Sequence, residues 1–152
     1  MQRPTSLYGI SKVYGELMGN YYYNKFGLNV RGARLPGLVR WKTEPAGGTT
    51  DYAAEACYAA VQKGSYTCYL KSGTLLPMMY MPDAVLALIQ LAEADVSALQ
   101  HLADFNLNAM SFAPEDLAEA IKRHISGFTM DPMRQAVADS WPSSQPRFSC
   151  TC

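Results

Sequence analysis

The stretch Pro4-Thr5-Ser6-Leu7-Tyr8-Gly9-Ile10-Ser11-Lys12 is the most informative segment of this 152-residue chain. Thr5 or Ser6 can act as a helix N-cap, because a hydroxyl there accepts a hydrogen bond from a free backbone N–H. Gly27 can end the same helix, since the left-handed conformation costs glycine little. Between these signals, apolar residues recur at helical spacing at Ile10, Val13, Tyr14, Leu17, Met18 and Tyr21. The pattern predicts a helix over residues 5–26.

Tyr8 and Lys12 are four positions apart, so a helix places them on one face. A lysine ammonium beside a phenol favours the phenolate, which lowers the pKa of a tyrosine from its usual value of about 10. Such a phenol can take a proton from a substrate alcohol, and the lysine can donate hydrogen bonds to sugar hydroxyls. Tyr21 and Lys25 have the same spacing, so only the surrounding residues distinguish the two pairs.

The rest of the chain alternates between predicted helices and strands, which is typical of an α/β protein. A strand over residues 28–35 is expected to stop at Pro36-Gly37. Ala-rich or amphipathic stretches and turn signals predict the other elements. Helices are expected over 50–63, 83–94, 114–124 and 132–140, and short strands over 66–70, 75–80 and 105–107. The methionines around Tyr80 are expected in the core.

Composition excludes several classes of protein. Thirteen Lys and Arg balance thirteen Asp and Glu, so the chain lacks the basic surface of a nucleic-acid-binding protein. No apolar run approaches the roughly 18 residues of a membrane span, and the first residues lack the apolar core of a signal peptide, so secretion is not expected. Cysteines form no C-x-x-C pair, so neither a zinc site nor a disulfide framework is predicted.

Several further stretches accompany Tyr8 and Lys12: Arg34-Leu35-Pro36-Gly37, Gly47-Gly48-Thr49-Thr50-Asp51-Tyr52, Asp131-Pro132-Met133-Arg134-Gln135 and Asp139-Ser140-Trp141-Pro142. With residues 4–12 they resemble the extended short-chain dehydrogenases/reductases, the NAD-dependent epimerase/dehydratase superfamily. Within it the chain is most similar to the short-chain-type L-threonine 3-dehydrogenases. The similarity extends over residues 3–142.

The resemblance implies the C-terminal portion of an NAD(P)-binding Rossmann-like α/β fold. Residues 1–40 would end the dinucleotide-binding domain, residues 41–140 would form a substrate-binding lobe with returning helices, and residues 141–152 would be an unstructured tail. It also implies site residues. Tyr8 would be the general base and Lys12 would bind the nicotinamide ribose. Pro36, Gly37 and Leu38 would line the nicotinamide, and Gly48, Thr49 and Thr50 would hold the substrate.

The residues themselves leave two of these assignments open. Pro36-Gly37 can be an ordinary turn, although the carboxyl end of a strand opens onto the ligand crevice in a doubly wound sheet. Thr50 can simply cap the helix after it, although a helix N-terminus offers unpaired N–H groups to a carboxylate. Both alternatives are compatible with the pattern.

The implied reaction is NAD-dependent oxidation of the β-hydroxyl of L-threonine to 2-amino-3-oxobutyrate. The helix face with Val13, Leu17 and Tyr21 would pack against a second subunit in a homodimer. Relatives of this kind occur in bacterial cytoplasm and in mitochondria, so the compartment stays open.

The chain departs from the family pattern in four respects. It has no Gly-rich turn after a first strand, so the N-terminal nucleotide-binding half is not in these residues. A strand expected between residues 114–124 and Asp131 looks deleted, and residues 143–152 have no counterpart. Ala113 stands where a Ser or Thr helix cap is expected, at a cost of about 1 kcal/mol. We therefore expect the isolated chain to be truncated and inactive, without tight NAD binding.

Two other functions remain to be distinguished. A nucleotide-sugar epimerase or dehydratase of the same superfamily shares the tyrosine–lysine pair. A non-catalytic, truncated partner of a full-length dehydrogenase would explain the missing half.

Overall fold

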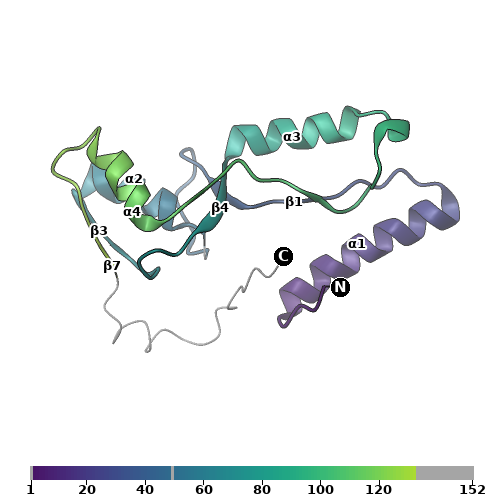
Figure 1. Ribbon diagram of the computed structural model, residues 1–152, viewed down its shortest axis with the longest axis horizontal. Helices are drawn as coiled ribbons and strands as arrows, with labels where there is room; N and C mark the ends of the chain where they lie inside the picture. Colours follow the sequence, from purple (N-terminus) through teal and green to yellow (C-terminus); the bar gives the residue numbers. More distant parts are fainter. Residues whose placement is uncertain (1, 49, 133–152) are drawn as a thin grey trace. The chain divides into compact units, whose positions relative to one another are not determined.

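A computed structural model describes residues 2–48 and 50–132, in two compact units (Figure 1). Unit 1 contains residues 1–35 and 82–107, and unit 2 contains residues 36–81 and 108–152. The helix expected over 132–140, the tail over 141–152 and Thr49 fall outside the described residues. The division expected from the sequence, into a dinucleotide-binding part over 1–40, a substrate-binding lobe over 41–140 and a tail over 141–152, stays a prediction.

Unit 1 is built on two helices and a short parallel strand pair. Its elements are α1 (Leu7–Phe26), β1 (Ala33–Arg34), α3 (Met81–Glu93, beginning at the last residue of unit 2), a 3-10 turn (Val96–Ala98) and β5 (Phe105–Asn106). β1 and β5 are parallel, with Ala33 opposite Phe105. The expected strand over 28–35 is therefore mostly irregular. Arg31 instead donates its guanidinium hydrogen bonds to the carbonyls of Leu91 and Ala92 at the end of α3.

The ends of α1 follow the sequence signals. The Ser6 hydroxyl accepts a hydrogen bond from the Gly9 N–H at 3.1 Å, which makes Ser6 the N-cap. Gly27 has a φ of 68°, and its N–H donates to the Tyr23 carbonyl at 2.8 Å. Gly19 is the buried residue of α1, and a Cβ there would lie 3.1 Å from Val30. A glycine at this position thus allows the helix to approach the segment before β1.

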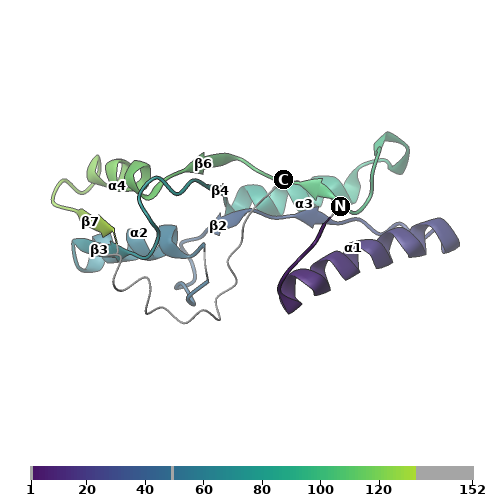
Figure 2. The same ribbon diagram turned by 60° about the horizontal axis from the view of Figure 1, so that its bottom comes forward.

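Unit 2 combines a mixed sheet with two helices and a second strand pair. Its elements are β2 (Gly37–Val39), α2 (Tyr52–Gln62), β3 (Ser65–Cys68), β4 (Leu76–Tyr80), β6 (Met110–Phe112), α4 (Pro114–Lys122) and β7 (Thr129–Pro132). β4 lies between β2, which is parallel to it, and β6, which is antiparallel. β3 and β7 are parallel neighbours, and α2 and α4 lie against them in both views (Figure 2).

The core of unit 2 is made by small and aromatic side chains. One cluster joins Tyr52 and Ala53 to Cys68 and Met78, all at most 1% exposed. A second cluster is formed by Ala56, Ala60, Ala118, Ile121 and Phe128. Met78 and Met79 are buried, as expected, whereas Tyr80 is exposed. Alanines on α2 therefore let this helix pack closely onto α4.

β7 corrects one expectation from the sequence. The strand before Asp131 was expected to be deleted, yet β7 pairs with β3 through Tyr66 opposite Met130 and Thr67 opposite Asp131. Phe128, which is 1% exposed, anchors the entry to this strand. The residues of β3 that pair with β7 lie more than sixty positions earlier in the chain, so the local sequence does not reveal the pairing.

Among the described residues, no helix has both the length and the apolar character that crossing a bilayer requires. The same residues contain no group of three His, Cys, Asp or Glu side chains arranged to hold a metal ion.

Candidate functional site

The first turn of α1 presents Tyr8 and Lys12 together. The Lys12 Nζ lies 5.0 Å from the centroid of the Tyr8 ring, and 61% of Tyr8 is exposed. The Ser11 hydroxyl donates to the Tyr8 carbonyl at 2.7 Å. A Cβ on Gly9 would lie 2.8 Å from that of Pro4, so a glycine lets the preceding chain fold against the helix. Tyr8 is the second residue of α1, so its exposed side chain belongs to the first turn of the helix.

Tyr21 and Lys25 have the same spacing as Tyr8 and Lys12, so spacing alone does not identify a functional pair. The Lys25 ammonium donates a hydrogen bond to the Tyr21 phenol at 2.9 Å. This pair lies near the C-terminal end of α1, and Tyr21 packs edge-on against Tyr22 and Phe26. The helix therefore brings both tyrosine–lysine pairs into contact, and only Tyr8 occupies the first turn.

The second group of predicted residues lies at β2. Pro36 precedes this strand, and Gly37 and Leu38 are its first two residues. A Cβ on Gly37 would lie 2.4 Å from the Met78 Sδ and 2.8 Å from the Thr50 Cβ. A glycine is needed here because β2 packs directly on both side chains. The structure thereby brings residues 36–38 next to Thr50, within unit 2.

The third group is the loop before α2. Gly48 is exposed and Thr50 is half-buried, and Gly47 has a φ of 86°. The Tyr69 hydroxyl donates to the Gly48 carbonyl at 3.0 Å. Thr50 does not begin the helix as its cap. Asp51 occupies that position, without a side-chain bond to the first turn of α2.

Asp51 is the residue that sequence reasoning missed. Asp51 is 6% exposed, and its carboxylate accepts hydrogen bonds from the Arg40 guanidinium at 2.9 and 3.2 Å. It also accepts from the N–H groups of Ala46 and Gly48, each at 3.0 Å. The Gly48 N–H is therefore not one of the unpaired donors expected there. Arg40 and Asp51 are eleven positions apart, and no local pattern joins them.

Burial and hydrogen bonding act in opposite directions on Asp51. Burial opposes ionisation, and the hydrogen bonds from Arg40, Gly48 and Ala46 favour it. The second effect prevails, so the pKa of Asp51 lies below its ordinary value. The carboxylate therefore stays ionised at neutral pH and accepts hydrogen bonds from the loop around it.

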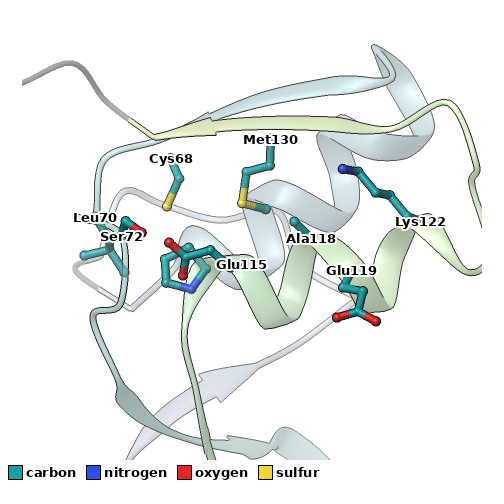
Figure 3. Close-up of a pocket in the computed structure, with 9 residues that line it drawn as sticks. Cys68, Leu70, Ser72, Glu115, Ala118, Glu119, Lys122 and Met130 are labelled. Atoms are coloured by element: carbon teal, nitrogen blue, oxygen red, sulfur yellow. The ribbon is translucent and has the colours of Figure 1, made fainter.

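A separate pocket of about 250 Å³ lies between β3 and α4 (Figure 3). None of the sequence-predicted site residues lines it. The sulfur atoms of Cys68 and Met130 point into the same space as the Glu115 carboxylate. Glu115 accepts hydrogen bonds from the Gly73 N–H, and a hydrogen bond from Ser72 holds its pKa below the ordinary value. Burial raises the pKa of the Cys68 thiol, which disfavours the reactive thiolate.

Comparison with known proteins gives several relatives, although no family model matches the chain. An uncharacterized epimerase/dehydratase of Staphylococcus haemolyticus is 49% identical over 148 residues, which are 95% of this chain and 46% of that protein. The X-ray structure of L-threonine dehydrogenase from Clostridium difficile is 45% identical, with a TM-score of 0.86 over 92% of this chain and 44% of that one. The chain thus spans less than half the length of these two proteins.

Two further solved structures show the same correspondence. The holo form of the Cupriavidus necator L-threonine dehydrogenase is 43% identical, with a TM-score of 0.85, over 91% of this chain and 45% of that one. A monomeric L-threonine 3-dehydrogenase from a metagenome is 40% identical, with a TM-score of 0.84 and the same coverage. The chain therefore has the α/β fold of the C-terminal half of the extended short-chain dehydrogenases/reductases, and in sequence it is similar to their L-threonine 3-dehydrogenases and epimerase/dehydratases.

Proposed function

We propose that this chain carries the tyrosine–lysine pair and the substrate loop of an NAD-dependent L-threonine 3-dehydrogenase. The reaction converts L-threonine and NAD⁺ to 2-amino-3-oxobutyrate, NADH and a proton. The observation that carries the proposal is the exposed Tyr8–Lys12 pair on α1, in a chain 45% identical to a solved L-threonine dehydrogenase.

Tyr8 is the general base in this proposal. Its phenol, as the phenolate, takes the proton of the β-hydroxyl. Lys12 stabilises the negative charge on the phenolate oxygen and donates hydrogen bonds to ribose hydroxyls. The exposure of Tyr8 supports these roles, since a buried phenol could not reach a substrate.

The residues present fit one part of the cofactor. Lys12 supplies the ammonium donor that a nicotinamide ribose requires, and Pro36, Gly37 and Leu38 are the proposed contacts of the nicotinamide ring. When bound, NAD⁺ accepts the hydride from the carbon that carries the hydroxyl. The 152 residues contain no Gly-rich turn for the diphosphate, so none of them is assigned to that contact.

The loop before α2 is the proposed substrate contact. Gly48, Thr49 and Thr50 would hold the threonine carboxylate at the N-terminus of α2, where the helix dipole favours an anion. Support comes from Thr50, which lies against Gly37 in the proposed nicotinamide-lining segment. Because Asp51 occupies the Gly48 N–H, we assign the carboxylate contact mainly to the two threonines.

A homodimer is the proposed assembly, through the outer face of α1. Leu17 and Tyr21 on this face are 62% and 46% exposed, and exposed apolar side chains on one helix face indicate a contact surface. One similar solved enzyme is described as monomeric, so the relatives differ in assembly. Light scattering on the native protein distinguishes the two states.

The relative named as an epimerase/dehydratase supports a second candidate, a reaction on nucleotide sugars. To separate the two, the native enzyme containing this chain is supplied with NAD⁺ and either L-threonine or a set of UDP-sugars. The proposal predicts NADH formation with L-threonine and no sugar conversion. Sugar conversion without threonine oxidation would contradict it. Turnover of neither substrate, with stable binding to a full-length dehydrogenase, would favour the non-catalytic partner.

A further inference from the structure

The carboxylate of Asp51 forms hydrogen bonds with the loop before α2 and not with the helix itself. It makes no side-chain bond to the first turn of α2. Its two oxygens instead accept four hydrogen bonds, two from the Arg40 guanidinium and one from each of the N–H groups of Ala46 and Gly48. At 6% exposure, this carboxylate is buried, and such groups are retained only with partners of this kind.

Gly48 and Asp51 are joined by two hydrogen bonds, one in each direction. The Asp51 N–H donates to the Gly48 carbonyl at 2.9 Å, while Gly48 donates its own N–H to the Asp51 side chain. A Cβ on Gly48 would lie 3.3 Å from the carboxylate, tighter than most real Cβ contacts. Ala46, Gly48 and Asp51 therefore form one hydrogen-bonded unit around the Asp51 carboxylate. The Tyr69 hydroxyl adds one further hydrogen bond, to the Gly48 carbonyl.

Arg40 connects this unit to the strand that carries Gly37. β2 ends at Val39, so the guanidinium that binds Asp51 is attached to the next residue. Thr50 precedes Asp51, and its Cβ lies 2.8 Å from where a Cβ on Gly37 would be. The ion pair thus joins the end of β2 to the start of α2, beside the Gly37–Thr50 contact.

We infer that Asp51 is a positioning residue, which orders residues 46–48 so that Thr50 stays against Gly37. This inference deepens the proposed function, because it rests on the assignment of this loop to the substrate. Asp51 itself touches neither substrate nor cofactor in this account. It acts through the backbone of the loop and through Arg40.

An amide cannot replace the carboxylate in this position. An Asn side chain has one acceptor oxygen and one donor NH₂ group, and the NH₂ group would face other donors. We therefore expect Asp51→Asn to release the loop while leaving the fold of unit 2 intact. Arg40→Gln removes the guanidinium that binds the Asp51 carboxylate, and it does so without changing a residue of the loop.

Asp116→Asn is the matched control. The Asp116 carboxylate accepts the Ala113 N–H at 2.8 Å at the start of α4, in the same unit and without contact to the loop. Both variants lose one carboxylate at a helix N-terminus, so a general loss of stability affects both. Only the Asp51 variant is expected to change the loop.

Two measurements on the native protein decide the inference. Hydrogen exchange of the Ala46 and Gly48 N–H groups, which bind the Asp51 carboxylate, should accelerate in Asp51→Asn and Arg40→Gln but not in Asp116→Asn. In steady-state kinetics, the KM for L-threonine should rise about tenfold or more in the first two variants, with a much smaller change in kcat. A merely structural role would lower the amount of active enzyme and leave KM unchanged.

Unchanged exchange of the Ala46 and Gly48 N–H groups in Asp51→Asn would overturn the inference. So would faster exchange with an unaltered KM for L-threonine. If the wild-type enzyme does not oxidise L-threonine at all, the proposed function fails, and with it the substrate role of the loop. The exchange measurement then still shows whether Asp51 orders residues 46–48, so the two failures are distinguishable.

Discussion

Gly37 is the residue at which the proposed site depends most directly on close packing. The sequence left Pro36-Gly37 open between an ordinary turn and a segment that lines the nicotinamide. Neither interpretation predicted the close contact of Gly37 with Met78 and Thr50. An added Cβ would approach the Met78 Sδ to 2.4 Å, and Met78 is itself fully buried.

We expect Gly37→Ala to lower the free energy of unfolding by about 1–3 kcal/mol, because the added methyl group overpacks a close contact. The control is Gly15→Ala in the interior of α1, where a Cβ meets nothing within 4 Å. That change should stabilise the protein by up to about 1 kcal/mol. Urea denaturation of the three proteins measures both effects, and equal effects of the two substitutions would contradict the packing argument.

Tyr52 and Tyr66 give a second test at the level of single hydroxyl groups. The Tyr52 hydroxyl is buried without a hydrogen-bond partner among the residues that the structure describes, and burial raises its pKa. The Tyr66 hydroxyl donates to Glu55 at 2.6 Å. Tyr52→Phe should therefore cost nothing, whereas Tyr66→Phe should lower the unfolding free energy by about 1–2 kcal/mol. Thermal or urea denaturation would refute this if Tyr52→Phe proved the more damaging change.

Asp51 also predicts how stability depends on pH. Burial opposes the ionisation of this carboxyl, but the hydrogen bonds from Arg40 and the loop outweigh it, so its pKa is lower in the folded state. Its stabilising contribution is complete above the unfolded pKa of about 3.9 and is lost as pH falls through the lower folded value. Unfolding free energies of wild type and Asp51→Asn should thus converge below about pH 4. A difference that grew with acidity would contradict this sign.

At the scale of elements, the four α-helices that the structure describes could be predicted from the sequence, as could β3, β4, β5 and, in part, β1, but the other strands could not. Caps and apolar spacing lie within the helix itself, as Ser6 and Gly27 show for α1. A strand is defined by a neighbour that can be distant in sequence. β6 has three residues and was not predicted. β7 was expected to be deleted because the chain between α4 and Asp131 looked too short for the strand, and its pairing with the remote β3 could not be seen in the sequence. The same holds for the candidate site. Tyr8 and Lys12 could be predicted because they form a local pattern, whereas the pair of Arg40 and Asp51 could not.

The start of α4 offers a test at this scale. Ala113 is the N-cap residue, and its side chain makes no cap bond. Asp116 already binds the Ala113 N–H, so half of a capping box is present. Ala113→Ser should add the missing hydroxyl and raise the unfolding free energy by about 0.5–1 kcal/mol. In the Asp116→Asn background the gain should be smaller, and an equal gain there would show that the two groups do not cooperate.

At the scale of the whole molecule, the chain contains two units and matches less than half the length of its relatives. Tyr8 and Lys12 belong to unit 1, while Gly37, Gly48 and Thr50 belong to unit 2. The expectation that the isolated chain neither binds NAD tightly nor turns over stays a prediction. Its basis is that no Gly-rich diphosphate turn occurs in the sequence.

The most direct measurement compares two phenylalanine variants of α1 in the native enzyme containing this chain. L-threonine-dependent NADH formation is recorded for wild type, Tyr8→Phe and Tyr21→Phe. Both variants lose a phenol from a tyrosine–lysine pair on the same helix. We predict that Tyr8→Phe lowers kcat by a factor of about 10²–10⁴, the usual contribution of a general base, while Tyr21→Phe retains wild-type activity. Full activity of Tyr8→Phe would contradict the assignment of Tyr8 as the base, and with it the central claim.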